Sequence, residues 1–341
     1  ISLSDTAVSV STQDAGTIIV PFAGSGDEST PPRYWRTARE LPAATKEAPL
    51  AGLHVAIDPG HIGGDYARVE ERWFQIGDAS PVMEGEMVLT VAKMLVPRLE
   101  ALGAKVSLVR DSTEPVTRQR REDFEAFARR KLREGSSAQI ASLSKRLFYR
   151  TAEIRERARL INEELKPDLV LCLHFNAEGW GDPNNPTLTN VNHFHVLING
   201  AYTSGEIAHE DERFEMLSRI FQGIHEEEAA LAGTMSRAFA ETTNLPPYLY
   251  KPDSLRALNV QDNPYVWARN LLANRLYQCP VLFLEPYVMN SNEVHARIQE
   301  GDYEGTRKIN GHQVPSIFRE YAEAVTKGLT EYYREHRATG D

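Results

Sequence analysis

The chain has 341 residues, 41% of them hydrophobic, which is enough for one large domain or two ordinary ones with a sizeable core. Its formal net charge of -10 argues against nucleic acid, which favours a basic face, and against anionic membrane surfaces as partners. No apolar run approaches the roughly 18–20 residues of a membrane span. We therefore expect no transmembrane segment.

The first 50 residues differ in composition from the rest. They are rich in Ser, Thr, Pro and Gly, and the run G-T-I-I-V-P-F at 16–22 is their only strand-like piece. We interpret residues 1–50 as an N-terminal extension of a domain that spans 51–341.

Within 51–341, short apolar runs typical of strands alternate with segments of helical periodicity. Strands are expected at 53–57, 105–109, 168–173, 193–198 and 280–284. Helices are expected at 84–102, 151–165, 211–243, 265–277 and 315–335. The alternation predicts an α/β fold, with a mostly parallel central sheet of five to six strands and helices on both faces. Pro97 is expected to kink or interrupt the first helix.

Two further features have structural interpretations. The highly charged segment 117–150 is expected to form a helical hairpin that projects into solvent, and we place it near the site as a hypothesis. Cys172 and Cys279 each lie in an apolar run, so they are interpreted as packing residues rather than a disulfide. A bridge between them stays open if their strands are neighbours.

Polar side chains suited to chemistry follow three of the expected strands. His174 and Glu285 come directly after apolar runs, and His61 lies on the loop after Asp58-Pro59-Gly60, which ends the first strand. In open α/β sheets ligands bind at the carboxyl ends of the strands. Glu84 lies four residues before Val88, on the apolar stripe of the first helix, whereas Glu86 is expected to face solvent. The pattern favours Glu84 as the fourth member of this set.

Some residues compete for these roles. His193 and His195 point to one face of an expected strand and are rival metal ligands, although an alternating strand with a solvated face explains them more simply. Asp58 also ends a strand, but Pro59 and Gly60 turn the chain after it, so it is expected to brace the loop.

Two histidines and one carboxylate form a catalytic zinc set that leaves a fourth position for water, whose pKa zinc lowers to about 7. A second carboxylate outside the metal's ligands can accept the water's proton and pass it to a leaving amine. Glu285 suits that role, because a low-dielectric wall beside it would raise its proton affinity.

Four segments, in the right order, resemble the zinc-dependent N-acetylmuramoyl-L-alanine amidases of the amidase-3 type, which hydrolyse peptidoglycan. The segments are I-D-P-G-H-I-G-G, E-G-E-M-V-L-T-V-A, L-C-L-H-F-N-A and V-L-F-L-E-P-Y-V-M-N-S-N. The run I-R-E-R-A-R-L-I-N is similar to the family's helix before its third strand. The resemblance covers roughly 53–336, with insertions near 117–150 and 201–262.

The resemblance implies zinc ligands His61, Glu84 and His174 and a catalytic Glu285. It implies cleavage of the amide between N-acetylmuramic acid and L-alanine, and a periplasmic or secreted location. The chain departs from the family in the extra Ile62, in Cys172-Leu173 before the histidine, and in Pro286-Tyr287 after the glutamate. These departures concern substrate preference more than metal binding.

The residues leave two alternative functions open. One is another zinc-dependent amide hydrolase that does not act on the cell wall. The H-x-x-E spacing of carboxypeptidases fails here, since Gly64 stands three residues after His61. The other is a catalytically silent binding module, which would be expected to have lost a ligand or the glutamate. Identification of the metal and of the product released from peptidoglycan would separate them.

Overall fold

The computed structural model describes residues 2–4, 6–12, 16–21, 33–182, 184–251, 254 and 256–337. The chain forms two compact units, Ile1–Arg33 and Tyr34–Asp341. The larger unit begins before the expected residue 51, because Trp35 and Leu41 are buried in it and Arg36 pairs with Asp168 at 2.7 Å.

The smaller unit is a three-stranded sheet of β1 (Ser2–Leu3), β2 (Ala7–Thr12) and β3 (Gly16–Pro21). Both pairings are antiparallel. Sequence analysis expected only the third of these strands. Residues 22–32 of the expected extension lie outside the described residues.

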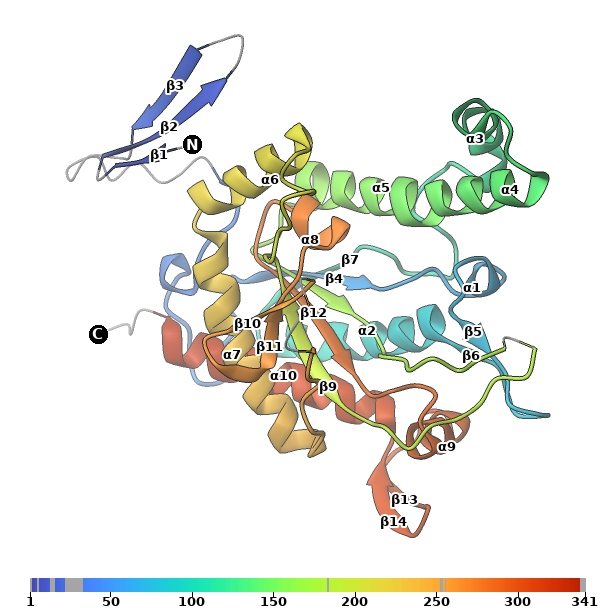
Figure 1. Cartoon of the computed structure of the whole chain (residues 1–341). Helices are drawn as coiled ribbons and strands as arrows, with labels where there is room; N and C mark the ends of the chain where they lie inside the picture. The colour runs from blue at the N-terminus through green and yellow to red at the C-terminus, as the bar shows by residue number, and fades with distance from the viewer. Residues whose placement is uncertain are drawn as a thin grey trace. The chain divides into compact units, whose positions relative to one another are not determined.

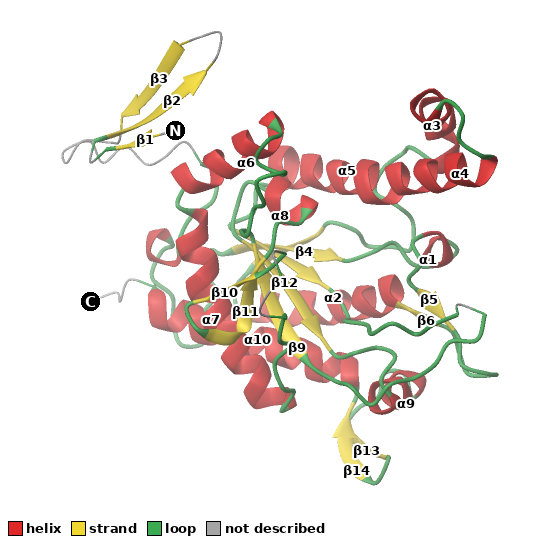
Figure 2. Ribbon diagram, viewed as in Figure 1, coloured by secondary structure: helices red, strands yellow, loops and turns green. Residues whose placement is uncertain are grey.

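A seven-stranded sheet forms the centre of the larger unit, in the order β10-β11-β9-β12-β8-β4-β7 (Figures 1 and 2). Its strands are β4 (His54–Pro59), β7 (Lys105–Leu108), β8 (Leu169–Leu173), β9 (Phe194–Ile198), β10 (Leu258–Val260), β11 (Asn263–Ala268) and β12 (Val281–Pro286). Four of the six pairings are parallel, whereas β9–β12 and β10–β11 are antiparallel. The α/β class and the mostly parallel sheet are confirmed.

The expected strand number of five to six and the helix at 265–277 are wrong. Residues 258–268 instead form the hairpin of β10 and β11, which extends the sheet beside β9. Burial alternates over the last four residues of β11, with Val266 and Ala268 buried and Tyr265 and Trp267 partly exposed, which is the period of two that suits a strand. Only a short helix, α8 (Leu272–Leu276), follows.

Helices cover both faces of the sheet (Figure 2). The helices described in the larger unit are α1 (Tyr66–Val69), α2 (Glu84–Ala101), α3 (Glu125–Leu132), α4 (Ser137–Arg146), α5 (Glu153–Arg159), α6 (Glu210–Phe221), α7 (Ile224–Thr243), α8, α9 (Asn292–Gln299) and α10 (Ile317–His336). The π-helical turns η3 (Leu147–Ala152) and η4 (Leu160–Leu165) flank α5, and the 3₁₀ turns are η1 (Ala38–Glu40) and η2 (Arg121–Phe124). Short hairpins pair β5 (Trp73–Phe74) with β6 (Val82–Met83) and β13 (Thr306–Ile309) with β14 (His312–Pro315).

The central strands are buried on both faces, and their alternate residues enter two separate cores. In β4, Val55 and Ile57 join the core that contains α2, α7 and α10, whereas Ala56 joins the core beneath α5 and α8. Because both faces are covered, only the ends of the strands open to solvent. That geometry directs any site to the loops at the strand ends.

Two helix expectations need correction. Helix α2 continues through Pro97 without interruption, and the exposed proline lies on its solvent side. The expected helix 211–243 is two helices, α6 and α7, separated at Gly223, whose φ of 66° lies in the left-handed region. No helix among the described residues is long and apolar enough to cross a membrane.

Segment 117–150 is helical, as predicted. It contains α3 and α4, and Ser136 begins α4 with a capping box to Gln139. Figure 1 shows α3 standing away from the sheet. The segment's end is buried, however, because Phe148 and Tyr149 pack against Ile62, the residue after His61. Ile62, the extra residue of the motif that contains His61, therefore contacts the expected insertion 117–150.

Candidate metal centre

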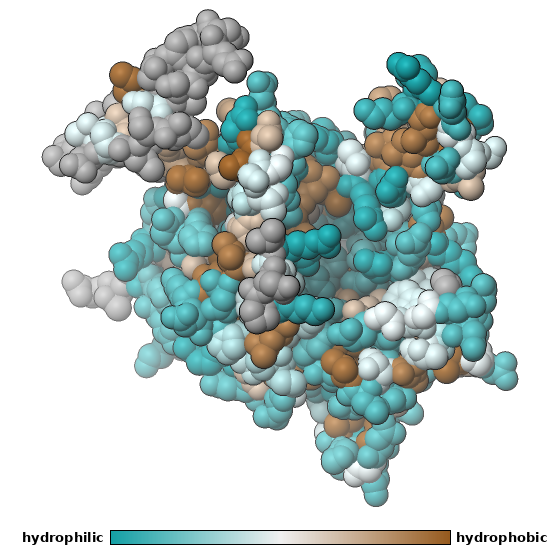
Figure 3. Space-filling model, in the orientation of Figure 1, coloured by the Kyte–Doolittle hydropathy of each residue, from teal (hydrophilic) through white to brown (hydrophobic). Residues whose placement is uncertain are grey.

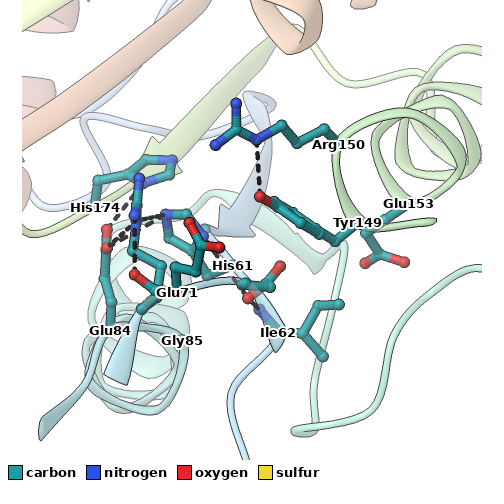
Figure 4. A network of polar contacts seen from close by, with 12 residues as sticks. His61, Ile62, Glu71, Glu84, Gly85, Tyr149, Arg150, Glu153 and His174 are labelled. Atoms are coloured by element: carbon teal, nitrogen blue, oxygen red, sulfur yellow. Dashed lines mark hydrogen bonds and ion pairs between the residues drawn. The ribbon is translucent and has the colours of Figure 1, made fainter. Parts of the chain in front are cut away.

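His61, Glu84 and His174 converge at the carboxyl ends of β4 and β8 (Figure 4). The Glu84 carboxylate lies between the two imidazoles: its Oε2 is 3.3 Å from Nε2 of His61, and its Oε1 is 3.1 Å from Nδ1 of His174. One candidate ligand atom from each residue lies within 4.8 Å of the others. Two imidazoles and a carboxylate are a donor set that suits zinc and leaves a coordination position open.

The loop that carries His61 is held by two buried arginines. Arg157 on α5 donates to Oδ1 of Asp58 at 2.8 Å, to the Pro59 carbonyl at 2.8 Å and to the His61 carbonyl at 2.7 Å. Arg110 donates to the carbonyls of Pro59 and Gly60, each at 3.3 Å. His61 has a φ of 57°, which is uncommon for a non-glycine residue, so these contacts hold it in a strained conformation.

Asp58 braces this loop, as the sequence predicted. Besides Arg157, it accepts a hydrogen bond from the Tyr277 hydroxyl at 2.6 Å. Cys172 lies next to it, with Sγ 3.9 Å from Oδ2. Cys172 and Cys279 are both free and buried, so their interpretation as packing residues is confirmed.

Two glycines let the site residues approach one another. A Cβ on Gly60 would lie 2.4 Å from Cε1 of His174, and one on Gly85 would lie 2.5 Å from the backbone nitrogen of Gly63. Gly60 therefore leaves room for the His174 ring, and Gly85 lets the start of α2 pack on the loop after His61. Both glycines stand inside the motifs that carry the site.

Glu84 is the first residue of α2 and is only 2% exposed. Oε1 also accepts from the backbone N–H of Phe175 at 3.2 Å, and Oε2 lies 3.3 Å from Nε of Arg72. The choice of Glu84 over Glu86 as the core-facing residue is confirmed. Glu86 is partly exposed and accepts from the Gly64 N–H at 3.2 Å.

The charge states of Glu84 and His61 suit cation binding. His174 has to release a proton to ligate a metal, because burial, which lowers its pKa, is outweighed by Glu285 and Glu84, which raise it. Burial opposes ionisation of Glu84, but His61, His174 and Arg72 outweigh it and lower the pKa of Glu84 to about 2. Burial lowers the pKa of His61 to about 3, so its imidazole is neutral at pH 7. An ionised carboxylate and a neutral imidazole are the forms in which these side chains ligate metals.

Glu70 stands behind His61. Its Oε2 lies 3.7 Å from Nδ1 of His61 and accepts the backbone N–H of Ile62 at 2.8 Å. The 3.7 Å approach to His61 is too long for a hydrogen bond, so Glu70 holds this loop through the backbone of Ile62. Sequence analysis did not find Glu70, because it lies in a polar loop with no periodic pattern.

Glu285 lies on β12, which pairs with β8 on one side and with β9 on the other. Its side chain lines the same cleft as His61, Glu84 and His174. Burial raises the pKa of Glu285 to about 7; His174 opposes the rise, and Glu84 adds to it. A carboxyl group with a pKa near 7 can both accept and donate a proton under neutral conditions.

His193 and His195 do not belong to the three-residue cluster, but the solvated face expected for them is wrong. They are 5% and 4% exposed, because the loop carrying Tyr248 packs on them with ring centroids at 4.7 Å and 5.0 Å. Asn176, two residues after His174, lies 3.4 Å from Nδ1 of His195. His195 is the cross-strand neighbour of Glu285 and lines the cleft.

The cleft has a volume of about 740 Å³. In addition to the site residues, its lining includes Arg68, Trp73 and Trp180, and also Tyr248, Tyr250 and Arg269. The face in Figure 3 has a central hollow bordered mainly by hydrophilic residues.

Segment 117–150 reaches this region. Lys145 pairs with Glu71, a residue of the cleft, at 2.6 Å, and Arg150 donates to the Tyr149 hydroxyl at 3.0 Å (Figure 4). The hypothesis that the segment lies near the site therefore agrees with these contacts.

The four residues singled out in the sequence line one cleft, but the sequence did not indicate the residues around them, chiefly Arg157, Arg110 and Glu70. The run I-R-E-R-A-R contains Arg157 among three arginines, and no local pattern separates it from Arg155 and Arg159. Only the packing of α5 on β4 makes one of the three buried.

An open α/β sheet that presents two histidines and two carboxylates in one cleft is an arrangement typical of metal-dependent hydrolases. A family model described as N-acetylmuramoyl-L-alanine amidase matches residues 55–309. The chain belongs to this family and is a peptidoglycan hydrolase of the amidase class.

Solved structures of several amidases are similar to this chain. They include the N-acetylmuramyl-L-alanine amidase Ami1 from Mycobacterium smegmatis, at 15% identity and a TM-score of 0.45, covering 84% of this chain and 99% of that one. The amidase AmiC2 of Nostoc punctiforme has 15% identity, a TM-score of 0.44 and coverages of 83% and 99%. The CwlV catalytic domain from Bacillus (Paenibacillus) polymyxa has 15% identity, a TM-score of 0.43 and coverages of 82% and 97%. Comparison with curated proteins gave no match.

Proposed function

We propose that His61, Glu84 and His174 bind one zinc ion and that Glu285 is the catalytic carboxylate for cleavage of the bond between N-acetylmuramic acid and L-alanine. The observation that carries the proposal is the closeness of one ligand atom from each of the three residues, within 4.8 Å. Mixed imidazole and carboxylate donors favour zinc over the all-oxygen sites of magnesium or calcium.

When bound, zinc supplies a Lewis acid that acidifies water and polarises the scissile carbonyl. The residues of this chain do the remaining work. Glu285 accepts the proton of the attacking water and then donates it to the nitrogen of the leaving L-alanine. Its partly buried position on β12 gives it the proton affinity for both steps. The walls of the cleft orient the substrate so that its amide faces Glu285.

We assign the catalytic role to the domain 51–341, extended by the packed residues 34–50, and regard 117–150 and 201–262 as insertions that shape the cleft. The substrate implies a periplasmic or secreted location, because peptidoglycan lies outside the cytoplasmic membrane. The two alternative functions predict a different product or no turnover at all.

The test is metal analysis of the purified protein combined with identification of the fragments it releases from peptidoglycan. A free stem peptide with N-terminal L-alanine, together with about one zinc per chain, is expected. Glu84→Gln should lose the metal, whereas the matched variant Glu86→Gln, two residues along the same helix, should keep it. Metal retained by Glu84→Gln would exclude this ligand set.

Glu285→Gln keeps the side-chain shape but removes the proton acceptor. We expect turnover to fall by about 10²–10⁴-fold, the usual contribution of a positioned acid–base group, while zinc stays bound. Near-normal turnover with full zinc content would show that the proton moves by another route.

A further inference from the structure

Arg269 lies on the Glu285 side of the cleft. It directly follows β11, and its backbone N–H donates to the Ile198 carbonyl at 2.9 Å, which fixes it beside β9. Its side chain is half-buried and lines the cleft. Sequence analysis gave this residue no role.

Among the described residues, the side-chain hydrogen bond of Arg269 goes to a neutral group. Burial raises the pKa of Glu285, and the positive charge of Arg269 acts in the opposite direction. The guanidinium of Arg269 donates to the Tyr250 hydroxyl at 3.3 Å and lies 5.8 Å from the centroid of that ring. Among the residues that the structure describes, no carboxylate forms an ion pair with it, whereas nearby Arg275 pairs with Glu212 and Glu215 at 3.0 Å and 2.5 Å. A partly desolvated guanidinium with free N–H groups is well suited to a bidentate contact with a carboxylate.

An aromatic wall connects Arg269 to the catalytic strand. His195 is the cross-strand partner of Glu285. Its ring lies 5.0 Å from that of Tyr248 and 5.8 Å from that of Tyr250, which in turn contacts Arg269. Arg269 is thus linked through one layer of rings to the residue that meets the leaving group.

The direction of the substrate follows from the proposed mechanism, on which this inference rests. Glu285 donates its proton to the nitrogen of L-alanine, so the peptide departs on the Glu285 side. Arg68 on α1 and Trp73 on β5 belong to the segment after β4, which lies on the other side of β12 from β9 and β11, and these residues form the opposite wall. The peptide therefore extends along Tyr248 and Tyr250, and the sugar lies toward the other wall.

We propose that Arg269, positioned by Tyr250, binds a carboxylate of the stem peptide and so determines specificity for its anionic form. The stem peptide carries carboxylates beyond its L-alanine, and in natural cell walls some of these are converted to amides. Arg269 would discriminate between the two forms, since an amide carries no charge to pair with the guanidinium.

The test uses the released product. Binding of the tripeptide L-Ala-γ-D-Glu-L-Lys, with both carboxylates free or both amidated, is measured by titration calorimetry. The wild-type protein is expected to bind the free form about 10- to 100-fold more tightly, the range of a charge-assisted hydrogen bond. Arg269→Gln should bring the ratio of the affinities for the free and the amidated peptide close to one, and Arg269→Lys should restore part of the preference for the free form.

Arg68→Gln is the matched control, because it removes one positive charge from the opposite wall of the same cleft. Its ratio should stay at the wild-type value, and circular dichroism verifies the fold of each variant. Equal affinity of the wild type for both peptides, an unchanged ratio in Arg269→Gln, or loss of the ratio in Arg68→Gln would each overturn the proposal. Because peptide binding needs no turnover, failure to cleave the muramoyl bond would refute the proposed function separately.

Discussion

Replacement of Arg157 by methionine tests how the loop before His61 is held. The guanidinium is buried, at 4% exposure, and donates to the carboxylates of Asp58 and Glu153 and to two backbone carbonyls of the loop. Methionine fills a similar volume but donates no hydrogen bond. Asp58 and Glu153 would then be left buried without their cation.

The expected loss follows from that arrangement. Removal of one partner of a buried ion pair costs about 3–5 kcal/mol, because the remaining charge stays uncompensated. Since folded proteins are stable by only about 5–15 kcal/mol, Arg157→Met should lose a large share of the stability. It should also weaken zinc binding, because the His61 carbonyl loses its donor.

Urea unfolding followed by tryptophan fluorescence measures the first effect, and metal analysis the second. Arg159→Met is the matched control: it lies one residue beyond Ala158 on the same helix and pairs with Glu156 at the surface at 2.8 Å. Its midpoint should hardly move. If Arg157→Met unfolds at the same urea concentration as Arg159→Met, the buried network does not stabilise the loop as described.

Three further outcomes are expected. Gly60→Ala should lower zinc affinity by about 10–100-fold, because the new Cβ would lie 2.4 Å from the His174 ring. Gly233→Ala is the control, since its Cβ would meet open space, and it should bind zinc normally. Equal zinc affinity in the two variants would contradict this prediction. Tyr277→Phe removes the 2.6 Å hydrogen bond to buried Asp58 and should cost about 1–3 kcal/mol in urea unfolding; an unchanged midpoint would show that Asp58 finds another donor. Chelator treatment should abolish turnover and lower the melting temperature, and added zinc should restore both. At a zinc concentration a thousand times the dissociation constant, binding should raise the free energy of unfolding by about 4 kcal/mol. Activity that survives chelation would argue against a metal.

The gathering of His61, Glu84, His174 and Glu285 in one cleft was predictable because each one leaves a local signal. His174 and Glu285 directly follow apolar runs, His61 follows the turn that ends one, and parallel strands bring their carboxyl ends to one edge of the sheet. Glu84 was separable from Glu86 because only one of two positions two residues apart can lie on the apolar stripe of a helix.

The surroundings of the centre were not predictable, because they depend on which elements become neighbours. The alternation around His193 and His195 indicated a strand, but not that β9 would be covered by the loop of Tyr248. The hairpin at 258–268 was taken for part of a loop and a helix, since its strands are short and bounded by charged residues. Both errors involve the region 201–262, which contributes Tyr248 and the first strand of the hairpin, β10.

The departures from the family motifs also became interpretable only in three dimensions. Tyr287 replaces a glycine of the family pattern, yet it retains a φ of 57°. Its hydroxyl donates to Oε1 of Glu320 on α10 at 3.0 Å, and its ring is fully buried. The strain of a left-handed tyrosine is thus opposed by packing that a glycine could not provide.

The strand order has a consequence for the timing of synthesis. β12 is the last strand of the sheet in the sequence, but it lies at the centre of the sheet, where it joins β8 to β9. Until Val281–Pro286 leave the ribosome, β7-β4-β8 and β9 with its hairpin are two half-sheets with unpaired edges, which slows folding and invites association with other chains. The strand that closes the sheet also delivers Glu285, so a nascent chain would acquire its fold and its hydrolytic activity in the same late event.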